Sequence, residues 1–234
     1  MLRLGRLVEL AVDSFFPRRC VGCGRVGVFV CAGCLGRMPR LLPPFCPRCG
    51  RRQSSGIVCP VCRQRQTDID GIRSVFILDD VIRKAIHQMK YRNVRSLSPY
   101  LAGFLADYMG SDRLDGEVLL PVPLHPRRMR ERGYNQSGLL AKEVGRLTGL
   151  PVIEDCLIRV RQVQPQVRAA DLEERRRNVA DAFLCLDDRV RGKRVIVVDD
   201  VCTSGATLEA CATALKNRSA ESVWGLTVAR EKHR

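Results

Sequence analysis

Two carboxylates and a run of small hydroxylated residues stand together near the C-terminus, in the segment VIVVDDVCTSGATL from Val195 to Leu208. The apolar run before Asp199 and Asp200 predicts a buried strand, and the residues after Gly205 predict a helix. Hydroxyls, backbone N–H groups and the helix dipole at such a loop can bind a phosphate monoester. The two acids lie where they could reach the hydroxyls of a sugar. The segment therefore predicts a sugar-phosphate site.

Two other interpretations fit part of this segment. An apolar strand ending in acids is typical of a Walker B strand, but the GxxxxGK[ST] loop that an ATPase requires is absent from the sequence. Alternatively, one acid caps a turn and Ser204 or Thr207 caps the following helix. That interpretation accounts for one acid and leaves the other without a role.

Eight of the 12 cysteines form four CxxC pairs. Each pair puts two thiolates on one side of a tight turn, and two pairs supply the four sulfurs of a tetrahedral zinc site. Pairing of neighbouring motifs leaves gaps of seven and nine residues, which suits short hairpins, and interleaved pairing stays open. The expected ligands of two structural zinc ions are Cys20, Cys23, Cys31, Cys34, Cys46, Cys49, Cys59 and Cys62.

A disulfide framework is the alternative for these cysteines. Glu9 and Asp13 interrupt the apolar part of the chain's start, which favours an amphipathic helix over a signal peptide. Cytoplasmic thiols stay reduced, so zinc and a cytoplasmic location are expected. We expect the unpaired cysteines to be buried, namely Cys156, Cys185, Cys202 and Cys211.

The charge is concentrated at one end of the chain. The net charge is +15, and residues 1–66 hold 12 arginines, no lysine and only two acids. Guanidinium groups suit phosphate contacts, so binding of single-stranded DNA by this segment is a second class of function. A solvated basic surface is the plainer interpretation of the same residues.

Beyond the cysteines, strand-like and helix-like runs alternate, which predicts an α/β fold with a mainly parallel sheet flanked by helices. We expect residues 1–66 to form an N-terminal helix and a double zinc-ribbon module, and residues 67–234 to form a second domain after a polar hinge. The expected strands are 74–78, 117–124, 157–160, 182–186, 194–199 and 222–230. The expected helices are 81–92, 97–109, 135–148 and 207–217.

A second strand end carries candidate chemistry, because ligands of such sheets bind outside the carboxyl ends of the strands. The strand LLPVP is followed by LHPRRMRERGYNQS, which we expect to form a loop around a pyrophosphate-like anion. Lys90 is a further candidate cation, although a lysine near a helix end is more often on the surface. The candidate arginines are Arg127, Arg128 and Arg132.

The segment from Val195 to Leu208 resembles the phosphoribosyl pyrophosphate (PRPP) motif of the type I phosphoribosyltransferases. The CxxC pairs, HQMKYR, PVPLHPRRMRERGYNQS and LIRVRQVQPQVRAADLEERRRNVADAF extend this resemblance to the ComF family, which includes ComFC and GntX-type proteins. The family's order of motifs is kept over almost the whole chain.

The resemblance implies a type I phosphoribosyltransferase fold that binds PRPP with Mg²⁺. Asp199 and Asp200 would contact the ribose hydroxyls, and Arg132 would complete the catalytic set. A flap at 159–178, with Gln166, Arg175 and Asn178, would cover the ligand. The residues implied for the 5-phosphate are Thr203, Ser204, Gly205, Ala206 and Thr207.

Two classes of function remain open. In the first, the chain is an enzyme that transfers phosphoribosyl to an acceptor, which no residue identifies. In the second, it is an accessory factor that binds single-stranded DNA and uses PRPP as a signal or not at all. The resemblance to competence proteins implies a role in DNA uptake beside a ComFA-like helicase.

Overall fold

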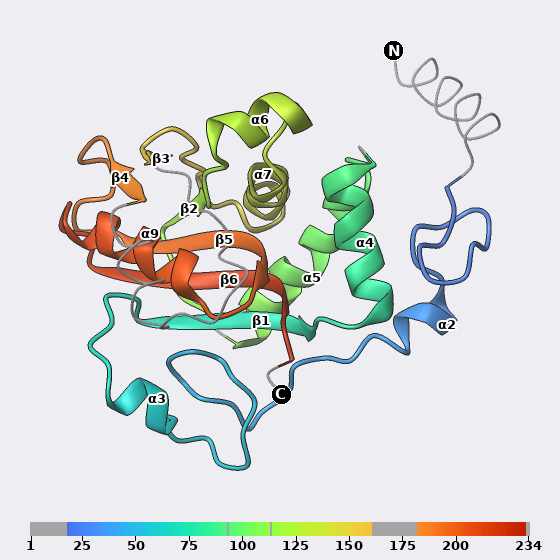
Figure 1. Ribbon diagram of the computed structural model, residues 1–234, viewed down its shortest axis with the longest axis horizontal. Coiled ribbons are helices and arrows are strands. Elements are labelled where there is room, and N and C mark those ends of the chain that lie inside the picture. Colours follow the sequence, from blue (N-terminus) through green and yellow to red (C-terminus); the bar gives the residue numbers. More distant parts are fainter. Residues whose placement is uncertain (1–17, 93, 113, 161–181, 233–234) are drawn as a thin grey trace.

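A computed structural model describes residues 18–92, 94–112, 114–160 and 182–232 (Figure 1). Its centre is a sheet of four parallel strands in the order β1-β6-β5-β2. The strands are β1 (Gly71–Ile77), β2 (Val118–Pro121), β5 (Arg194–Cys202) and β6 (Ser222–Arg230). The mainly parallel sheet predicted from the alternating pattern is confirmed.

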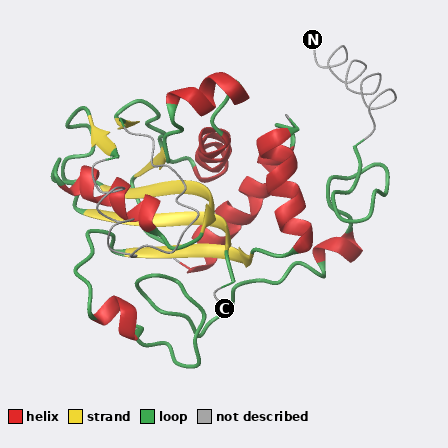
Figure 2. Cartoon of the chain, in the orientation of Figure 1, coloured by secondary structure: helices red, strands yellow, loops and turns green. Residues whose placement is uncertain are grey.

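Helices cover both faces of the sheet (Figure 2). α5 (Leu97–Asp112) and α7 (Gln136–Thr148) pack on one face together with α4 (Asp80–Tyr91), and α9 (Ala206–Lys216) packs on the other. Successive side chains of a strand point to opposite faces, so β5 contributes Ile196 and Val198 to the first core and Val195 and Val197 to the second. Burial on both faces explains why β5 is apolar from Val195 to Val198.

β3 (Leu157–Arg159) and β4 (Phe183–Cys185) form a separate antiparallel pair. Both were expected as strands, but they do not extend the parallel sheet. The pair flanks 161–181, so Gln166, Arg175 and Asn178 of the expected flap lie outside the described residues. The expected N-terminal helix also lies outside them.

The arginine-rich segment after β2 is a helix, α6 (Pro126–Arg132), where we expected a loop. Pro126 stands at the first helical position, where its missing N–H costs nothing, and His125 accepts a hydrogen bond from the backbone N–H of Arg127. Gly133 ends the helix in the left-handed conformation with φ 77°. These local signals outweigh the high charge of the segment.

The N-terminal cysteines form two ribbons with the same hydrogen-bond pattern. Ribbon 1 spans residues 18–36 and includes α2 (Ala32–Leu35), and ribbon 2 spans 45–64 and includes α3 (Pro60–Arg63). The N–H of Cys20 donates to the carbonyl of Arg25, as that of Cys46 does to the carbonyl of Arg51. Arg25 and Arg51 are therefore equivalent positions of a structural repeat.

The chain between and within the ribbons covers β1, an edge strand of the sheet (Figure 1). Backbone hydrogen bonds run from Leu41 to Val75 and from Ile77 to Pro39, and the N–H of Ile72 donates to the carbonyl of Arg48 at 2.7 Å. These bonds satisfy backbone N–H and C=O groups of β1. Without them, the edge strand could pair with a strand of another chain. Ribbon 1 instead packs in the core that contains α4 and α5.

The polar segment expected as a hinge is held against α9. The N–H of Asp68 donates to the Glu209 carboxylate at 2.8 Å, and the Thr213 hydroxyl donates to the Asp68 carboxylate at 2.6 Å.

Within the described residues, no helix is long and apolar enough to cross a membrane.

Substitution of Gly50 tests the docking of ribbon 2. A Cβ atom at Gly50 would lie 2.4 Å from the carbonyl oxygen of Ile72, whereas one at the equivalent Gly24 would meet nothing within 4 Å. Both glycines have positive φ, so either alanine variant should lose about 1–2 kcal/mol through backbone strain. Gly50→Ala should lose about 1–3 kcal/mol more through overpacking. Thermal melts of the zinc-loaded proteins measure the difference, and equal losses would contradict this docking.

Candidate functional site

Asp199 and Asp200 lie in the last part of β5, at the carboxyl edge of the sheet. The Asp199 carboxylate accepts hydrogen bonds from the Ser137 hydroxyl at 2.7 Å and from the N–H of Asp200 at 2.9 Å. Burial and the neighbouring charge of Asp200 raise the pKa of Asp199, while Lys90 and Ser137 act in the opposite direction. Ser137, at the start of α7, was missed because nothing in its local sequence connects it with β5.

Asp200 is only 2% exposed, and its charge is balanced by Lys90. Lys90 Nζ of α4 lies 2.5 Å from Asp200 Oδ2, and the side chain of this lysine is 22% exposed. The contact is an ion pair without the alignment of a hydrogen bond, since this oxygen has no hydrogen-bond partner among the described residues. Of the two interpretations of Lys90 from the sequence, the surface lysine was wrong.

The loop from Thr203 to Thr207 connects the acids to α9. Gly205 has φ 85° and precedes the first residue of the helix, and Ser204 Oγ accepts a hydrogen bond from the N–H of Ala206 at 3.3 Å. Ser204 therefore closes a turn before the helix, whose N-cap is Gly205 without a side-chain hydrogen bond. The alternative in which Ser204 or Thr207 caps the helix is wrong. Thr203 and Ser204 are exposed.

A cleft of about 520 Å³ brings these groups together at the ends of the strands. Both acids, Thr203, Thr207, Lys90 and Arg128 line it, and residues that were not predicted for it include His87 and Ser137. An adjoining cavity of about 510 Å³ is lined by Lys90, Tyr91, Arg128, Glu131, Arg132 and Tyr134.

The three candidate arginines of α6 differ in their surroundings. Arg128 lines both the cleft and the adjoining cavity. Arg132 donates to the side-chain oxygen of Gln136, and its guanidinium lies 5.3 Å from the centre of the Tyr91 ring. Arg127 pairs with Glu131 at 2.9 Å and does not line either space.

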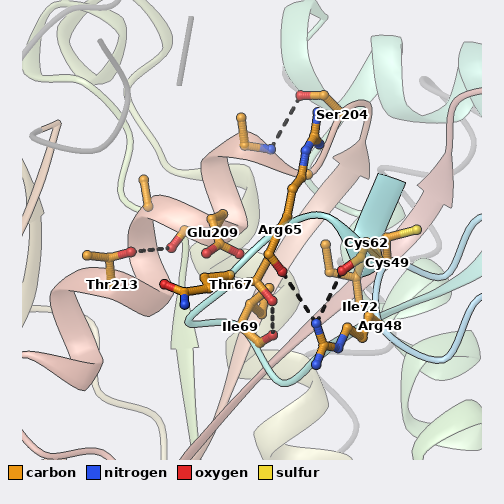
Figure 3. A pocket seen from close by; sticks show the side chains of 14 residues that line it. Arg48, Cys49, Cys62, Arg65, Thr67, Ile69, Ile72, Ser204, Glu209 and Thr213 are labelled. Carbon is orange, nitrogen blue, oxygen red and sulfur yellow. Dashed lines mark hydrogen bonds between the residues drawn. The ribbon is translucent and has the colours of Figure 1, made fainter. Parts of the chain in front are cut away.

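A third cavity, of about 270 Å³, separates ribbon 2 from the other side of the same loop (Figure 3). Ribbon 2 contributes Arg48, whose guanidinium donates to the carbonyls of Cys62 and Arg65 at 3.2 and 3.5 Å. The loop contributes Ser204, and the Arg65 side chain extends across the cavity toward it in Figure 3. Ribbon 2 thus forms a wall beside the loop.

The eight paired cysteines form two clusters, Cys20/Cys23/Cys31/Cys34 and Cys46/Cys49/Cys59/Cys62, each with sulfurs within 4.8 Å of one another. The pairing is sequential, as favoured from the sequence. Four thiolates about 2.3 Å from one zinc ion would be about 3.8 Å apart. The Cys23–Cys31 and Cys49–Cys59 sulfur distances are 3.6 and 3.9 Å, so the donor sets fit Zn²⁺. The four single cysteines are buried, as expected.

Comparisons with known proteins give separate matches for the cysteine-rich segment and for the C-terminal part of the chain. A family described as "Double zinc ribbon domain" matches residues 11–64, and one described as "Phosphoribosyl transferase domain" matches residues 162–234. The chain is 29% identical over 227 residues to "Competence protein F" of Haemophilus influenzae, which covers 91% of this chain and 98% of that protein. Over most of its length the chain is therefore similar to the ComF competence proteins.

Other relatives carry related names. The chain is 28% identical to "Competence protein ComFC" of Bacillus subtilis, over 86% of this chain and 84% of that protein. It is 28% identical to "DNA utilization protein YhgH" of Escherichia coli, over 83% and 87% respectively.

Similar solved structures include a glutamine PRPP amidotransferase from B. subtilis, with TM-score 0.40 and 25% identity over 57% of this chain and 26% of that chain. A purine phosphoribosyltransferase from Pyrococcus horikoshii matches with TM-score 0.36 and 17% identity, over 56% and 70%.

Removal of the Lys90 charge tests the buried pair. Lys90→Met leaves Asp200 without a counter-charge, so we expect a loss of about 1–3 kcal/mol, which is a fall of about 2–10 °C in melting temperature. Lys84→Met is the matched control, because Lys84 lies on the same helix and pairs with Asp80 at the surface. Its loss should be below about 0.5 kcal/mol. Similar melting temperatures for the two variants would contradict the role given to Lys90.

Zinc content tests the two clusters. The purified protein should hold two zinc ions per chain by elemental analysis, and Cys34→Ser should hold one, because three thiolates bind zinc less tightly. Cys156→Ser should keep both, since Cys156 lies in neither cluster. Loss of both ions from Cys34→Ser would mean that the clusters do not form independently.

Proposed function

We propose that this protein binds PRPP with Mg²⁺ and transfers its phosphoribosyl group to an acceptor. The observation that carries the proposal is the meeting of two acids, a hydroxyl-rich loop at a helix start, and Lys90 in one cleft of about 520 Å³. A single ligand in this cleft could therefore contact the acids through its sugar, the loop through a phosphate, and Lys90 through a further anionic group.

Asp199 and Asp200 would hold the ribose hydroxyls and the metal ion. Mg²⁺ prefers oxygen ligands and usually takes one or two protein carboxylates beside substrate phosphates and water, which fits this donor set. When bound, Mg²⁺ neutralises charge that develops on the pyrophosphate oxygens. Burial and the neighbouring charge of Asp200 raise the pKa of Asp199, and a bound metal ion would offset both effects.

The loop from Thr203 to Thr207 would bind the 5-phosphate. The Thr203 and Thr207 side chains line the cleft, and the start of the 11-residue helix α9 lies beside them, which favours an anion at this point. Ser204, Gly205 and Ala206 line the cavity on the other side of the loop, so their contacts with the phosphate would require the loop to adjust. The exposed side chains of Thr203 and Ser204 are accessible to a ligand in solution.

The pyrophosphate would be held on the α6 side. Arg128 and Arg132 are the better candidates, because they line the cleft or the cavity beside it, while the guanidinium of Arg127 is occupied by Glu131. Lys90 lines both spaces and adds a positive charge between the acids and α6.

Asp199, Asp200 and Arg132 are the proposed catalytic residues. In the transfer, the bond between the anomeric carbon and a pyrophosphate oxygen breaks, and a bond from that carbon to the acceptor forms. Pyrophosphate leaves with the bonding electrons, and the acceptor loses a proton. Positive charge develops on the sugar, so the acids would stabilise it while the arginine stabilises the leaving group.

A second candidate function is that of an accessory factor for DNA uptake, which binds single-stranded DNA beside a ComFA-like helicase. It is favoured by the arginine excess of residues 1–66 and by relatives named for competence and DNA utilization. Reduced thiols that hold zinc fit a cytoplasmic protein in either case.

Calorimetric titration of PRPP, with and without Mg²⁺, tests the first proposal. Asp199→Asn/Asp200→Asn should bind PRPP at least about 100-fold more weakly than the wild type, since each of the two charge-assisted hydrogen bonds contributes about 1.5–3 kcal/mol. Asp187→Asn/Asp188→Asn is the control, because these exposed or half-buried acids pair with Arg189 and Arg191 outside the cleft. Absence of PRPP binding by the zinc-loaded wild type would leave the accessory function.

A further inference from the structure

A large cavity outside the sugar-phosphate cleft lies where ribbon 2 meets the carboxyl ends of β1 and β6. Its volume is about 760 Å³, which is in the range of sites for small-molecule ligands. Ile77 ends β1 and Arg230 ends β6, so the cavity opens at the same edge of the sheet as Asp199 and Asp200. It is lined by Leu41, Arg51, Arg52, Gln53, Ser54, Ile77, Arg230, Glu231 and Lys232.

The lining is strongly basic. It contains four cations and one acid, and of the cations Lys232 pairs with Asp79 at 3.2 Å. Among the described residues, the side chains of Arg51 and Arg52 make no hydrogen bond and no ion pair. Within that part of the chain, three guanidinium groups therefore face one cavity without a carboxylate partner.

Two of these guanidinium groups have a buried Nε donor that is unsatisfied among the described residues. Arg230 is 3% exposed, and its only side-chain hydrogen bond among the described residues runs from Nη1 to Cys202 Sγ at 3.0 Å. The Nε atoms of Arg230 and Arg51 are both buried, with no hydrogen-bond partner in the described ranges. Arg230 interacts electrostatically with the thiol of Cys49 in the second cysteine cluster, but its buried Nε still lacks an acceptor. Buried donors without a partner are rare, and the oxygens of an anion in the cavity would satisfy them.

The cavity adjoins the sugar-phosphate cleft, because Glu231 lines both spaces. Cys202, the partner of Arg230, belongs to the strand that carries the two acids. A ligand in the cavity would therefore lie next to a sugar phosphate in the cleft, and its anionic group would contact ribbon 2.

We propose that this cavity is a second anion site, which binds the phosphate group of a nucleotide or of a nucleic acid strand beside the cleft. Guanidinium forks match the oxygens of a phosphate group, and the excess of positive charge suits its negative charge. The site is built by Arg51 and Arg52 of ribbon 2 together with Arg230 of β6. The anion site does not depend on PRPP binding in the cleft. Only the inference that its ligand is the acceptor of the phosphoribosyl group rests on the proposed function.

The repeat of the two ribbons supplies a matched control. Arg25 of ribbon 1 occupies the position of Arg51, with the same backbone hydrogen bond from the first cysteine of its motif. Arg25 is exposed and does not line the cavity. Arg25→Ala and Arg51→Ala each remove one positive charge from equivalent positions of the two ribbons. Only Arg51→Ala changes the lining of the cavity.

Binding of thymidine, thymidine 5′-monophosphate and a fluorescent single-stranded oligothymidylate would be measured by calorimetry and anisotropy, with PRPP and Mg²⁺ present to occupy the cleft. We expect a phosphate-bearing probe to bind the wild type and thymidine not to bind. Arg51→Ala should weaken binding about 10-fold, and so should Arg52→Ala at an exposed residue, since each removes one charge-assisted phosphate interaction. Arg25→Ala should leave binding unchanged. Zinc content confirms that each variant is folded.

The two phosphate-bearing probes distinguish the source of the anion. Binding of the mononucleotide indicates a small ligand. Binding of the oligonucleotide alone indicates a strand, and each arginine removed should then make the dependence of log K on log salt concentration shallower by about 0.7. An equal weakening in Arg25→Ala would show a general charge effect and overturn the proposal. Failure of both probes to bind the wild type would also overturn it, whether or not PRPP binds in the same samples.

Discussion

The ion pair between Asp200 and Lys90 sets the conditions for the rest of the site. Asp200 is almost fully buried at the end of a strand, and its carboxylate meets Lys90 at 2.5 Å. A buried carboxylate stays ionised only if a positive charge is close, so β5 and α4 must keep this spacing. α4 is held by the core that it shares with α5 and ribbon 1, where Val81 would lie 3.2 Å from a Cβ atom at Gly22. The first ribbon therefore supports the acids through a helix.

The second ribbon acts on the opposite side. A module of this size cannot bury enough apolar surface to fold without help, and clusters of four thiolates fit zinc as the replacement for a core. Once folded, ribbon 2 and the segment before it cover the open edge of β1, and ribbon 2 brings arginines beside the loop and the strand ends. The ribbons thus contribute to the surroundings of the cleft from two directions.

Sequence alone predicted the parts whose signals are local. An apolar run before Asp199 indicates a buried strand, and the CxxC spacing indicates zinc, because both depend on neighbours in the chain. Lys90 was named from the sequence as a candidate cation, but its pairing with Asp200 and the contact of Ser137 with Asp199 depend on where α4 and α7 pack, which no local pattern contains. The segment after β2 was expected as a loop that follows a strand end, although Pro126 and Gly133 are ordinary signals for the start and end of a helix. The cavity beside Arg230 arises only when ribbon 2 docks, so its residues could not be grouped from the sequence.

A crystal structure of the zinc-loaded protein with PRPP and Mg²⁺ tests the central claim most directly. The account predicts density for the 5-phosphate at the loop from Thr203 to Thr207, with the ribose hydroxyls within hydrogen-bond distance of Asp199 and Asp200. The pyrophosphate should then lie toward Arg128 and Arg132. Density for PRPP elsewhere, with the acids still paired only to Lys90 and Ser137, would contradict the account.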